Sequence, residues 1–467
     1  MENGSMRDNV KRDERGWKVA VAGECMLSRT FRAHAEPEFL KIREIMTDAD
    51  VCYGHLEMNF GAFTACPARG DWIGSYMLAD PAIAKELHWL GIDMMSLANN
   101  HSFDYGAPVL LETIRHCREA EMTCAGTGSD LDEAREPAYW EGEAGRVALI
   151  STSTGNGAYE WANFPKGSMP ARPGVNPLRV KMRYRIPASE AETLRRIGKE
   201  LGVLRVKGAS VEGSTPVGLE DGEFRIVMPS DQSQKGSGAF CEGEDFGIES
   251  ICNPRDMDGN LRSIKEAKIM ADFVMVAHHF NLSEGSRGDV PPSFAREFAH
   301  AAIDAGADVY FGHGWHKTLG VEIYKGKPIF YGLGNFFAQS QFIRRVPYDS
   351  YETWGHDVNQ LPSLRPSDEP LHPGMDRVQA TWWSSALIEM EYTPDKQIKA
   401  ITFYPVELGR EVSQAAPITR YTGHFAEGRP LIATGENAQR ILERFQTLSK
   451  PFGTEIKIDG DIARWEA

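Results

Sequence analysis

Five short apolar or β-branched runs of this sequence end in side chains that commonly bind metal ions. The first run ends at Glu24 and the second at His55 and Glu57; the later runs end at Asn99, Asn100 and His101, at His278 and His279, and at His313 and His316. In layered α/β sheets, functional side chains collect on the loops that follow the carboxyl ends of the strands. The five endings therefore predict one shared site and indicate a metalloenzyme.

The ligand types restrict which metal such a site would bind. Imidazoles and carboxylates with few thiolates suit borderline divalent ions such as Zn, Mn, Fe or Co, and they suit Cu(I) or Ca poorly. Two such ions about 3.5–4 Å apart would activate water and polarise an oxygen of the substrate. We therefore expect one or two divalent transition-metal ions as cofactors.

Strands and helices alternate on both sides of an irregular central stretch, and the strands must position the five endings. Apolar runs predict strands at 18–22, 51–53, 94–97, 273–277 and 309–311. Apolar periodicity, with Pro or Gly near some of the ends, predicts helices at 81–90, from 108, at 294–305 and at 436–448. We expect a single domain over 17–467, with an insertion at about 155–258 that is rich in Gly, Pro and Ser and contains one helix at 188–201. A long insertion of this kind either folds over the site or is disordered.

Composition and charge exclude several classes of protein. The chain has 467 residues, of which 42% are apolar and 25% charged, and this composition is globular. The formal net charge of −15 and the absence of a Lys/Arg-rich run argue against binding to nucleic acid or anionic lipid. No apolar run approaches the roughly 20 residues needed to cross a bilayer. We therefore expect no nucleic-acid or membrane partner; self-association into a homo-oligomer stays open.

The N-terminal segment and the cysteines indicate in which cellular compartment the protein is expected. Residues 1–16 have no apolar segment that could serve as a secretion signal, and Gly4-Ser5 before Met6 is typical of a cloning remnant. We expect this N-terminal segment to be disordered or cloning-derived. Seven cysteines without a CxxC pair fit reduced thiols better than a disulfide framework. The expected location is the cytoplasm.

Several segments together resemble a known family. They are VAVAGECMLSR, ADVCYGHLEMNF, SLANNHSFDYG, VMVAHHF, GHGWH, KGKPIFYGLGNFF and LSKPFGTEI, in this order along the chain. They are similar to the CapA family, named for poly-gamma-glutamate capsule biosynthesis. The resemblance implies an α/β (α+β) calcineurin-like metallophosphoesterase fold, a four-layer sandwich of two packed β-sheets flanked by helices. It also implies a metal centre at one edge of the sheets.

The resemblance and the residue types together select the site residues. The candidate metal ligands are Glu24, Glu57, Asn100, His279, His313 and His316. Adjacent strand residues point to opposite faces, so only one of His278 and His279 can face the metal, and the family spacing favours His279. Two positions depart from the family pattern, because Glu24 stands where Asp is usual and His55 stands where Asn is usual.

Other residues near these motifs are candidates for catalysis and substrate binding. The family resemblance suggests His101 as a proton donor, and Asp104 is close enough in sequence to orient its imidazole. Aromatic rings and guanidinium groups can clamp a ring and a carboxylate. The candidate substrate-binding residues are His55, Arg69, Trp72, Arg172, Trp315 and Arg344.

Three functional classes fit these residues. The first is a metal-dependent hydrolase that cleaves an amide, peptide or ester bond of a small anionic molecule or peptide. The second is an epimerase or lyase that abstracts a proton next to a carboxylate. CapA relatives in lasso-peptide pathways resemble this second class. The third is a non-enzymatic protein of capsule or polyglutamate assembly. The convergent His and Glu residues favour an enzyme, and the sequence does not decide between hydrolysis and proton abstraction.

Overall fold

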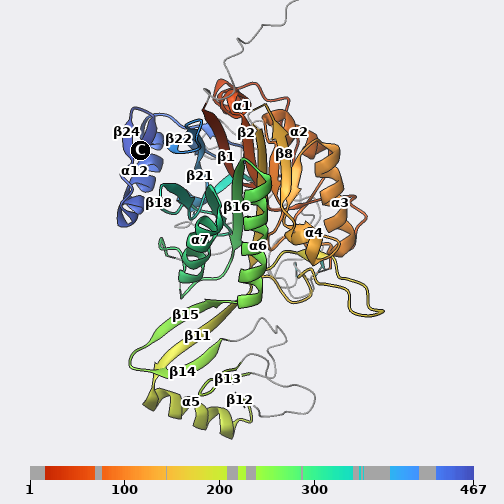
Figure 1. The fold of residues 1–467 in the computed structure, drawn as a ribbon, viewed down its shortest axis with the longest axis vertical. Helices are drawn as coiled ribbons and strands as arrows, with labels where there is room; N and C mark the ends of the chain where they lie inside the picture. Colours follow the sequence, from red (N-terminus) through yellow and green to blue (C-terminus); the bar gives the residue numbers. More distant parts are fainter. Residues whose placement is uncertain are drawn as a thin grey trace, which may run out of the picture.

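The computed structural model describes most of the chain (Figure 1). The described residues are 16–68, 76–143, 145–207, 219–227, 238–285, 288–339, 347–348, 351, 379–409 and 428–467. The expected disordered or cloning-derived segment at 1–16 lies outside these residues, apart from Gly16.

Two β-sheets form the centre of the molecule. The larger has ten described strands in the order β24-β25-β22-β21-β1-β2-β5-β6, with β20 beside β1 and β23 beside β22. The smaller has six described strands in the order β18-β19-β17-β16-β9-β8. The strands of the larger sheet are β1 (Trp17–Met26), β2 (Val51–Leu56), β5 (Met94–Ser96), β6 (Thr123–Ala125), β20 (Asn335–Ala338), β21 (Ser384–Tyr392), β22 (Ile398–Glu407), β23 (Leu431–Ile432), β24 (Lys457–Asp459) and β25 (Ile462–Glu466). Those of the smaller sheet are β8 (Ala138–Gly142), β9 (Gly145–Thr154), β16 (Phe273–Phe280), β17 (Val309–His313), β18 (Val321–Tyr324) and β19 (Lys327–Phe330).

The surroundings of strand β1 explain why its sequence is almost entirely apolar. Successive side chains of a strand point to opposite faces. Val19 and Val21 enter the core between the two sheets, whereas Ala20 and Ala22 enter the core beneath the outer helices. Strands that are buried on both faces read as continuous apolar runs rather than as alternating ones.

Helices cover the outer face of each sheet. Helices α1, α2 and α3 share one core with the larger sheet, and α6 and α7 share another with the smaller sheet. Their bounds are α1 (Pro37–Asp48), α2 (Ala82–Leu90), α3 (Gly106–Glu119), α6 (Pro254–Met270) and α7 (Ser293–Ala305). The described residues therefore form the predicted four layers of helix, sheet, sheet and helix. The further elements of the body are β3 (Asn59–Phe60), β4 (Leu78–Ala79), β7 (Thr127–Gly128), α4 (Leu131–Arg135), β10 (Gly174–Val175), α9 (Gln379–Trp382), α12 (Gly435–Ser449) and the 3-10 helix η4 (Lys450–Phe452).

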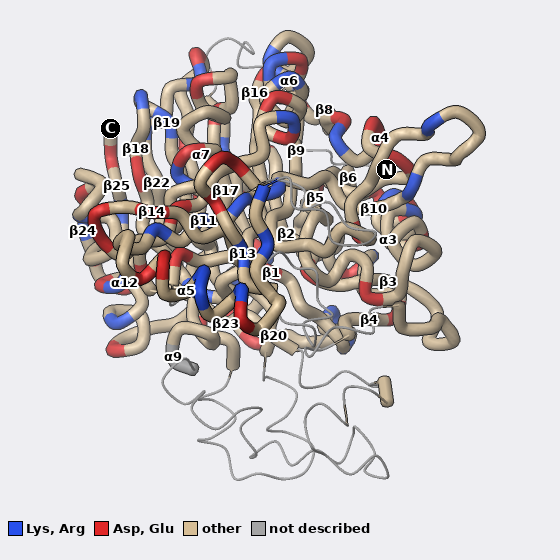
Figure 2. The backbone as a smooth tube through the Cα atoms, turned by 90° about the horizontal axis from the view of Figure 1, so that it is seen from below, with Lys and Arg blue, Asp and Glu red and all other residues tan. Residues whose placement is uncertain are grey.

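Residues 180–252 form a lobe that projects from the body (Figure 1). Its described strands pair in the order β12-β13-β14-β11-β15. Ala191 of α5 shares a small core with Ile186 and Phe224 of this sheet. Seen from below, the lobe stands in front of the two sheets and carries charges of both signs (Figure 2). The elements are β11 (Val180–Pro187), α5 (Ala188–Glu200), β12 (Leu204–Val206), β13 (Phe224–Ile226), β14 (Ala239–Gly243) and β15 (Gly247–Cys252). The sequence analysis predicted the helix but none of these strands.

The pairing of the strands brings their carboxyl ends together. Strands β1, β2 and β5 run parallel in the larger sheet, and β9, β16 and β17 run parallel in the smaller one. In a parallel arrangement, the segments that follow the strands leave from the same edge. The metal-binding side chains predicted from the sequence lie in the last residues of these strands or in the segments that follow them.

Candidate metal centre

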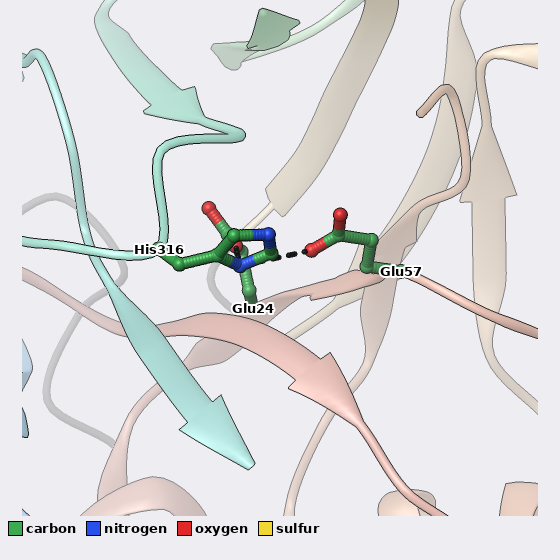
Figure 3. A group of neighbouring side chains, drawn as sticks. All are labelled: Glu24, Glu57 and His316. Atoms are coloured by element: carbon green, nitrogen blue, oxygen red, sulfur yellow. Dashed lines mark ion pairs between the residues drawn. The ribbon is translucent and has the colours of Figure 1, made fainter. Parts of the chain in front are cut away.

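Glu24, Glu57 and His316 form the centre of the candidate site (Figure 3). Each offers one ligand atom, and these atoms lie within 4.8 Å of one another. The two glutamates are buried, and the side chain of His316 is 16% exposed. Three side chains from separate segments of the chain therefore converge at the shared edge of the sheets.

Glu24 is held by contacts to both of its carboxylate oxygens. Oε1 accepts a hydrogen bond from the backbone N–H of Gly314 at 2.6 Å, and Oε2 lies 2.6 Å from His316 Nδ1. Burial raises the pKa of Glu24, but the charge and the hydrogen bond of His316 lead the effects that hold the pKa well below its ordinary value. Glu24 is therefore an anion at neutral pH, which is the form that binds a metal ion.

The backbone at Glu24 requires a glycine before it. The register of β1 with β2 shifts between Val21 and Glu24, and the N–H of Glu24 donates to the carbonyl of Gly334 at 2.9 Å. A Cβ atom on Gly23 would lie 2.2 Å from that carbonyl oxygen. Gly23 therefore allows β1 to approach the turn before β20, and this approach sets the position of Glu24.

His316 has a strained backbone conformation. Its φ is +54°, in the left-handed region that residues with a side chain seldom adopt. Such a conformation costs about 1–3 kcal/mol and is common at functional sites. Contacts of Nδ1 to Glu24 and to Oδ1 of Asn335, the latter at 3.0 Å, hold the ring in place, and the ring packs 4.5 Å from that of Trp382.

His279 and His313 are direct neighbours on β16 and β17. His279 Nε2 lies 3.7 Å from Glu57 Oε1, and His313 Nδ1 lies 4.0 Å from Glu24 Oε1. Both nitrogens are buried and have no hydrogen-bond partner among the described residues. Burial lowers the pKa of His313 to about 4 and that of His279 well below its ordinary value, so both rings are neutral near pH 7.

These two nitrogens provide the test of whether a metal ion fits. Distances of 3.7 and 4.0 Å are too long for hydrogen bonds. Ligand atoms about 2.0–2.2 Å from a shared divalent ion lie roughly 3–3.5 Å apart, so a small adjustment would bring these atoms onto an ion. A buried polar nitrogen without a partner is otherwise costly. Neutral imidazoles beside anionic carboxylates therefore fit one or two divalent ions.

His278 points to the opposite face of β16. Its ring nitrogens lie 2.8 Å from Thr154 Oγ1 and 2.8 Å from the hydroxyl of Tyr310, and its ring packs edge-on against Phe294 and Phe298. His278 is therefore a core residue with both nitrogens satisfied, as strand alternation requires once His279 faces the site.

His101 and Asp104 form a hydrogen-bonded pair in the loop after β5. His101 Nδ1 lies 2.7 Å from Asp104 Oδ2, and both side chains are buried. The loop is braced because the backbone N–H of His101 donates to Asn99 Oδ1 and its carbonyl accepts from Asn59 Nδ2. Asn100 is buried in the same loop. This pairing orients the His101 ring through its Nδ1.

The residues proposed for substrate binding have varied surroundings. Trp315 is 7% exposed and packs edge-on against Phe280 in the core beneath α7, so its ring is largely covered. Arg172 donates to the carbonyl of Trp161 within its own loop. Arg69, Trp72 and Arg344 lie outside the described residues.

His55 lies behind the ligands rather than in front of them. It is 1% exposed, and its nitrogens lie 2.6 Å from Ser96 Oγ and 2.9 Å from His279 Nδ1. These contacts leave no ring nitrogen for a substrate, so the position supports a structural role beside His279 in place of the predicted substrate contact.

The sequence analysis missed Tyr53, Ser96, Asn335 and Trp382. The hydroxyl of Tyr53 contacts Ser96 and His313, while Asn335 and Trp382 contact His316. One signal was available in the sequence. Tyr53 is two residues before His55 on one strand, and residues with that spacing point to the same face.

The four layers and the site at the sheet edge define a metallophosphoesterase-like protein. The family described as bacterial capsule synthesis protein PGA_cap matches residues 18–340. This chain therefore belongs to that family, and its predicted kinship with CapA proteins is confirmed. Among the described residues, no helix is long and apolar enough to cross a membrane.

Individual relatives differ in how much of the chain they match. The protein y4sH of Sinorhizobium fredii is 31% identical over 458 residues, which cover 96% of this chain and 92% of y4sH. The PGA biosynthesis protein CapA of Bacillus subtilis is 42% identical over 92 residues, or 20% of this chain and 23% of CapA. The capsule biosynthesis protein CapA of Bacillus anthracis is 24% identical over 271 residues, or 58% of this chain and 46% of that protein.

Proposed function

We propose that this protein is a metal-dependent hydrolase that cleaves an amide, peptide or ester bond of a small anionic molecule or peptide. The observation that carries the proposal is the pair of buried nitrogens, His279 Nε2 and His313 Nδ1, that face Glu57 and Glu24 and have no hydrogen-bond partner in the described part of the chain. The names of the Bacillus relatives connect the family with capsule and PGA biosynthesis. Poly-gamma-glutamate is an anionic polyamide, and this chemistry favours an acidic substrate with an amide bond.

Glu24, Glu57, His279, His313 and His316 would hold the divalent ions. A bound divalent ion would lower the pKa of a water molecule and polarise the substrate carbonyl. The anionic carboxylates would balance the positive charge of the ions, and the neutral imidazoles would supply nitrogen ligands. The buried position of these side chains would exclude bulk water and strengthen the electrostatic interactions of the site.

His101 would supply the proton that the leaving group needs. Asp104 accepts the Nδ1–H of His101 and thereby fixes the orientation of the ring. The same carboxylate stabilises the protonated imidazole, whose Nε2–H would pass to the leaving nitrogen or oxygen. This arrangement needs no movement of the loop, because Asn99 and Asn59 already hold the backbone of His101.

Isotope labelling tests the proposal directly. The metal-loaded protein is incubated with anionic amides, esters and peptides, once in water enriched in oxygen-18 and once in deuterium oxide. Hydrolysis places oxygen-18 in a product carboxylate, and chelator-treated protein does not. Deuterium at a substrate carbon without oxygen-18 would replace this proposal with the epimerase or lyase. Entry of neither label would favour the non-enzymatic assembly protein.

A further inference from the structure

A buried chain of three side chains connects His279 and His313 of the smaller sheet. The hydroxyl of Tyr53 lies 2.8 Å from His313 Nε2 and 2.6 Å from Ser96 Oγ. His55 Nδ1 lies 2.6 Å from the same Ser96 oxygen, and His55 Nε2 lies 2.9 Å from His279 Nδ1. Tyr53, Ser96 and His55 are each at most 1% exposed, so bulk water does not compete for these contacts.

Metal ligation would determine where the protons of this chain lie. A ligating imidazole is neutral and presents a lone pair to the ion, so its other nitrogen carries the hydrogen. If His279 binds through Nε2, its Nδ1–H donates to His55 Nε2, and His55 must then donate from Nδ1 to Ser96. If His313 binds through Nδ1, its Nε2–H donates to the Tyr53 oxygen, and the hydroxyl of Tyr53 can then donate its own hydrogen to Ser96.

Ser96 is therefore the point at which the two arms of the chain meet. A serine oxygen has two lone pairs and can accept from Tyr53 and His55 together. If Ser96 instead donated to His55, the order of that arm would reverse and His279 would present an N–H to the metal. If Ser96 donated to Tyr53, the Tyr53 oxygen would have to accept from Ser96 and His313 together, and the Tyr53 hydrogen would lose its acceptor within the chain. Both histidines can be ligands only when His55 donates to Ser96, and the Tyr53 hydrogen keeps an acceptor within the chain only when Tyr53 donates to Ser96 as well.

We propose that Ser96 accepts hydrogen bonds from both Tyr53 and His55, and that this chain positions His279 and His313 as simultaneous metal ligands through Nε2 and Nδ1. The inference rests on the metal centre of the proposed function. Tyr53, Ser96 and His55 are positioning residues, because they act through the two ligands and have no contact of their own with the ion. Partners of this kind fix the tautomer and the orientation of a ligand.

The packing of the rings supports a fixed arrangement. The ring of His55 stacks on that of His313 with centroids 4.1 Å apart and planes 13° apart, and it lies 5.0 Å from the ring of His279 at 21°. Tyr53 stacks on Phe311 with centroids 4.5 Å apart. A flip of the His55 ring would exchange its nitrogens for carbons and break its hydrogen bonds to Ser96 and His279.

Metal titration of variants tests the chain without measuring activity. Metal-free wild-type protein, Ser96→Ala, Tyr53→Phe and a control, Ser263→Ala, are titrated with Zn²⁺ against a competing chelator. Ser263 is also buried, but its hydroxyl bonds to the Gly259 carbonyl on α6. Ser96→Ala and Tyr53→Phe should weaken Zn²⁺ binding by about 10- to 100-fold. The control should match the wild type, and thermal unfolding checks that every variant is folded.

A crystal structure of the Zn²⁺-loaded wild type provides a second test that needs no variant. We expect His279 Nε2 and His313 Nδ1 to be ligating atoms. Ligation by only one of these histidines, or unchanged Zn²⁺ affinity in both folded variants, overturns the inference and leaves the proposed function standing. A wild type that binds no Zn²⁺, Mn²⁺, Fe²⁺ or Co²⁺ overturns both.

Discussion

The adjacent residues His278 and His279 allow one pair of variants to separate metal binding from folding. His279 Nε2 faces Glu57 and has no hydrogen-bond partner within the described ranges, whereas both nitrogens of His278 are bonded in the core on the other face of β16. We expect His279→Ala to lose most of its metal with little effect on the stability of the metal-free protein. We expect His278→Ala to keep its metal and to be clearly less stable.

The expected loss of stability in His278→Ala follows from its contacts. The change removes a buried ring that packs on Phe294 and Phe298, and it leaves the hydroxyls of Thr154 and Tyr310 without this partner. Truncating a large core side chain to alanine costs about 2–5 kcal/mol, and each buried polar group left unsatisfied costs about 1–3 kcal/mol. We therefore expect a loss of at least about 3 kcal/mol, enough to lower the melting temperature by several degrees.

Two measurements decide the outcome. Elemental analysis after gel filtration gives the metal content per chain, and thermal unfolding of chelator-treated protein gives the stability without metal. Each variant serves as the control of the other, because the two changes are the same and lie at neighbouring positions. Full metal content in His279→Ala, or metal loss in His278→Ala at unchanged stability, would refute the assignment of the two faces of β16.

Three further changes test other parts of the site. Glu24→Gln should lower metal content and activity together, because a neutral amide is a poorer ligand for a divalent cation; a fully metallated, active variant would remove Glu24 from the site. Asp104→Asn should keep the metal but lower kcat by about 10²–10⁴-fold, because His101 loses its orienting carboxylate; an unchanged kcat in steady-state assays would assign the pair to loop structure alone. Gly23→Ala should lose both metal and stability, because its Cβ would lie 2.2 Å from the Gly334 oxygen. Elemental analysis measures the metal content and thermal unfolding measures the stability. Wild-type values of both would show that β1 can shift to make room for the methyl group.

The strands of the lobe show why part of the fold could not be predicted from local patterns. Along β11, the charged residues Lys181, Arg183 and Arg185 alternate with less polar ones, which is a period of two. Alternation of this kind is typical of a half-buried strand, but a face with three positive charges is stable there only because other segments neutralise it. Arg183 and Arg185 both contact Glu249 on β15, at 2.9 and 2.7 Å. These partners are more than 60 residues away in sequence.

The sequence by itself predicted several strands and helices of the body and the residue types at the strand ends, because apolar periodicity and capping act over a few residues. It also favoured His279 over His278, since the family spacing selects one residue and alternation on a strand turns its neighbour away. The tertiary structure decided which side chains meet. Only the pairing of β2, β5, β16 and β17 places Tyr53 and Ser96 behind the histidines, and only the packing of α7 covers Trp315. Contacts between distant segments depend on how the sheets pair and pack, and no local pattern contains that information.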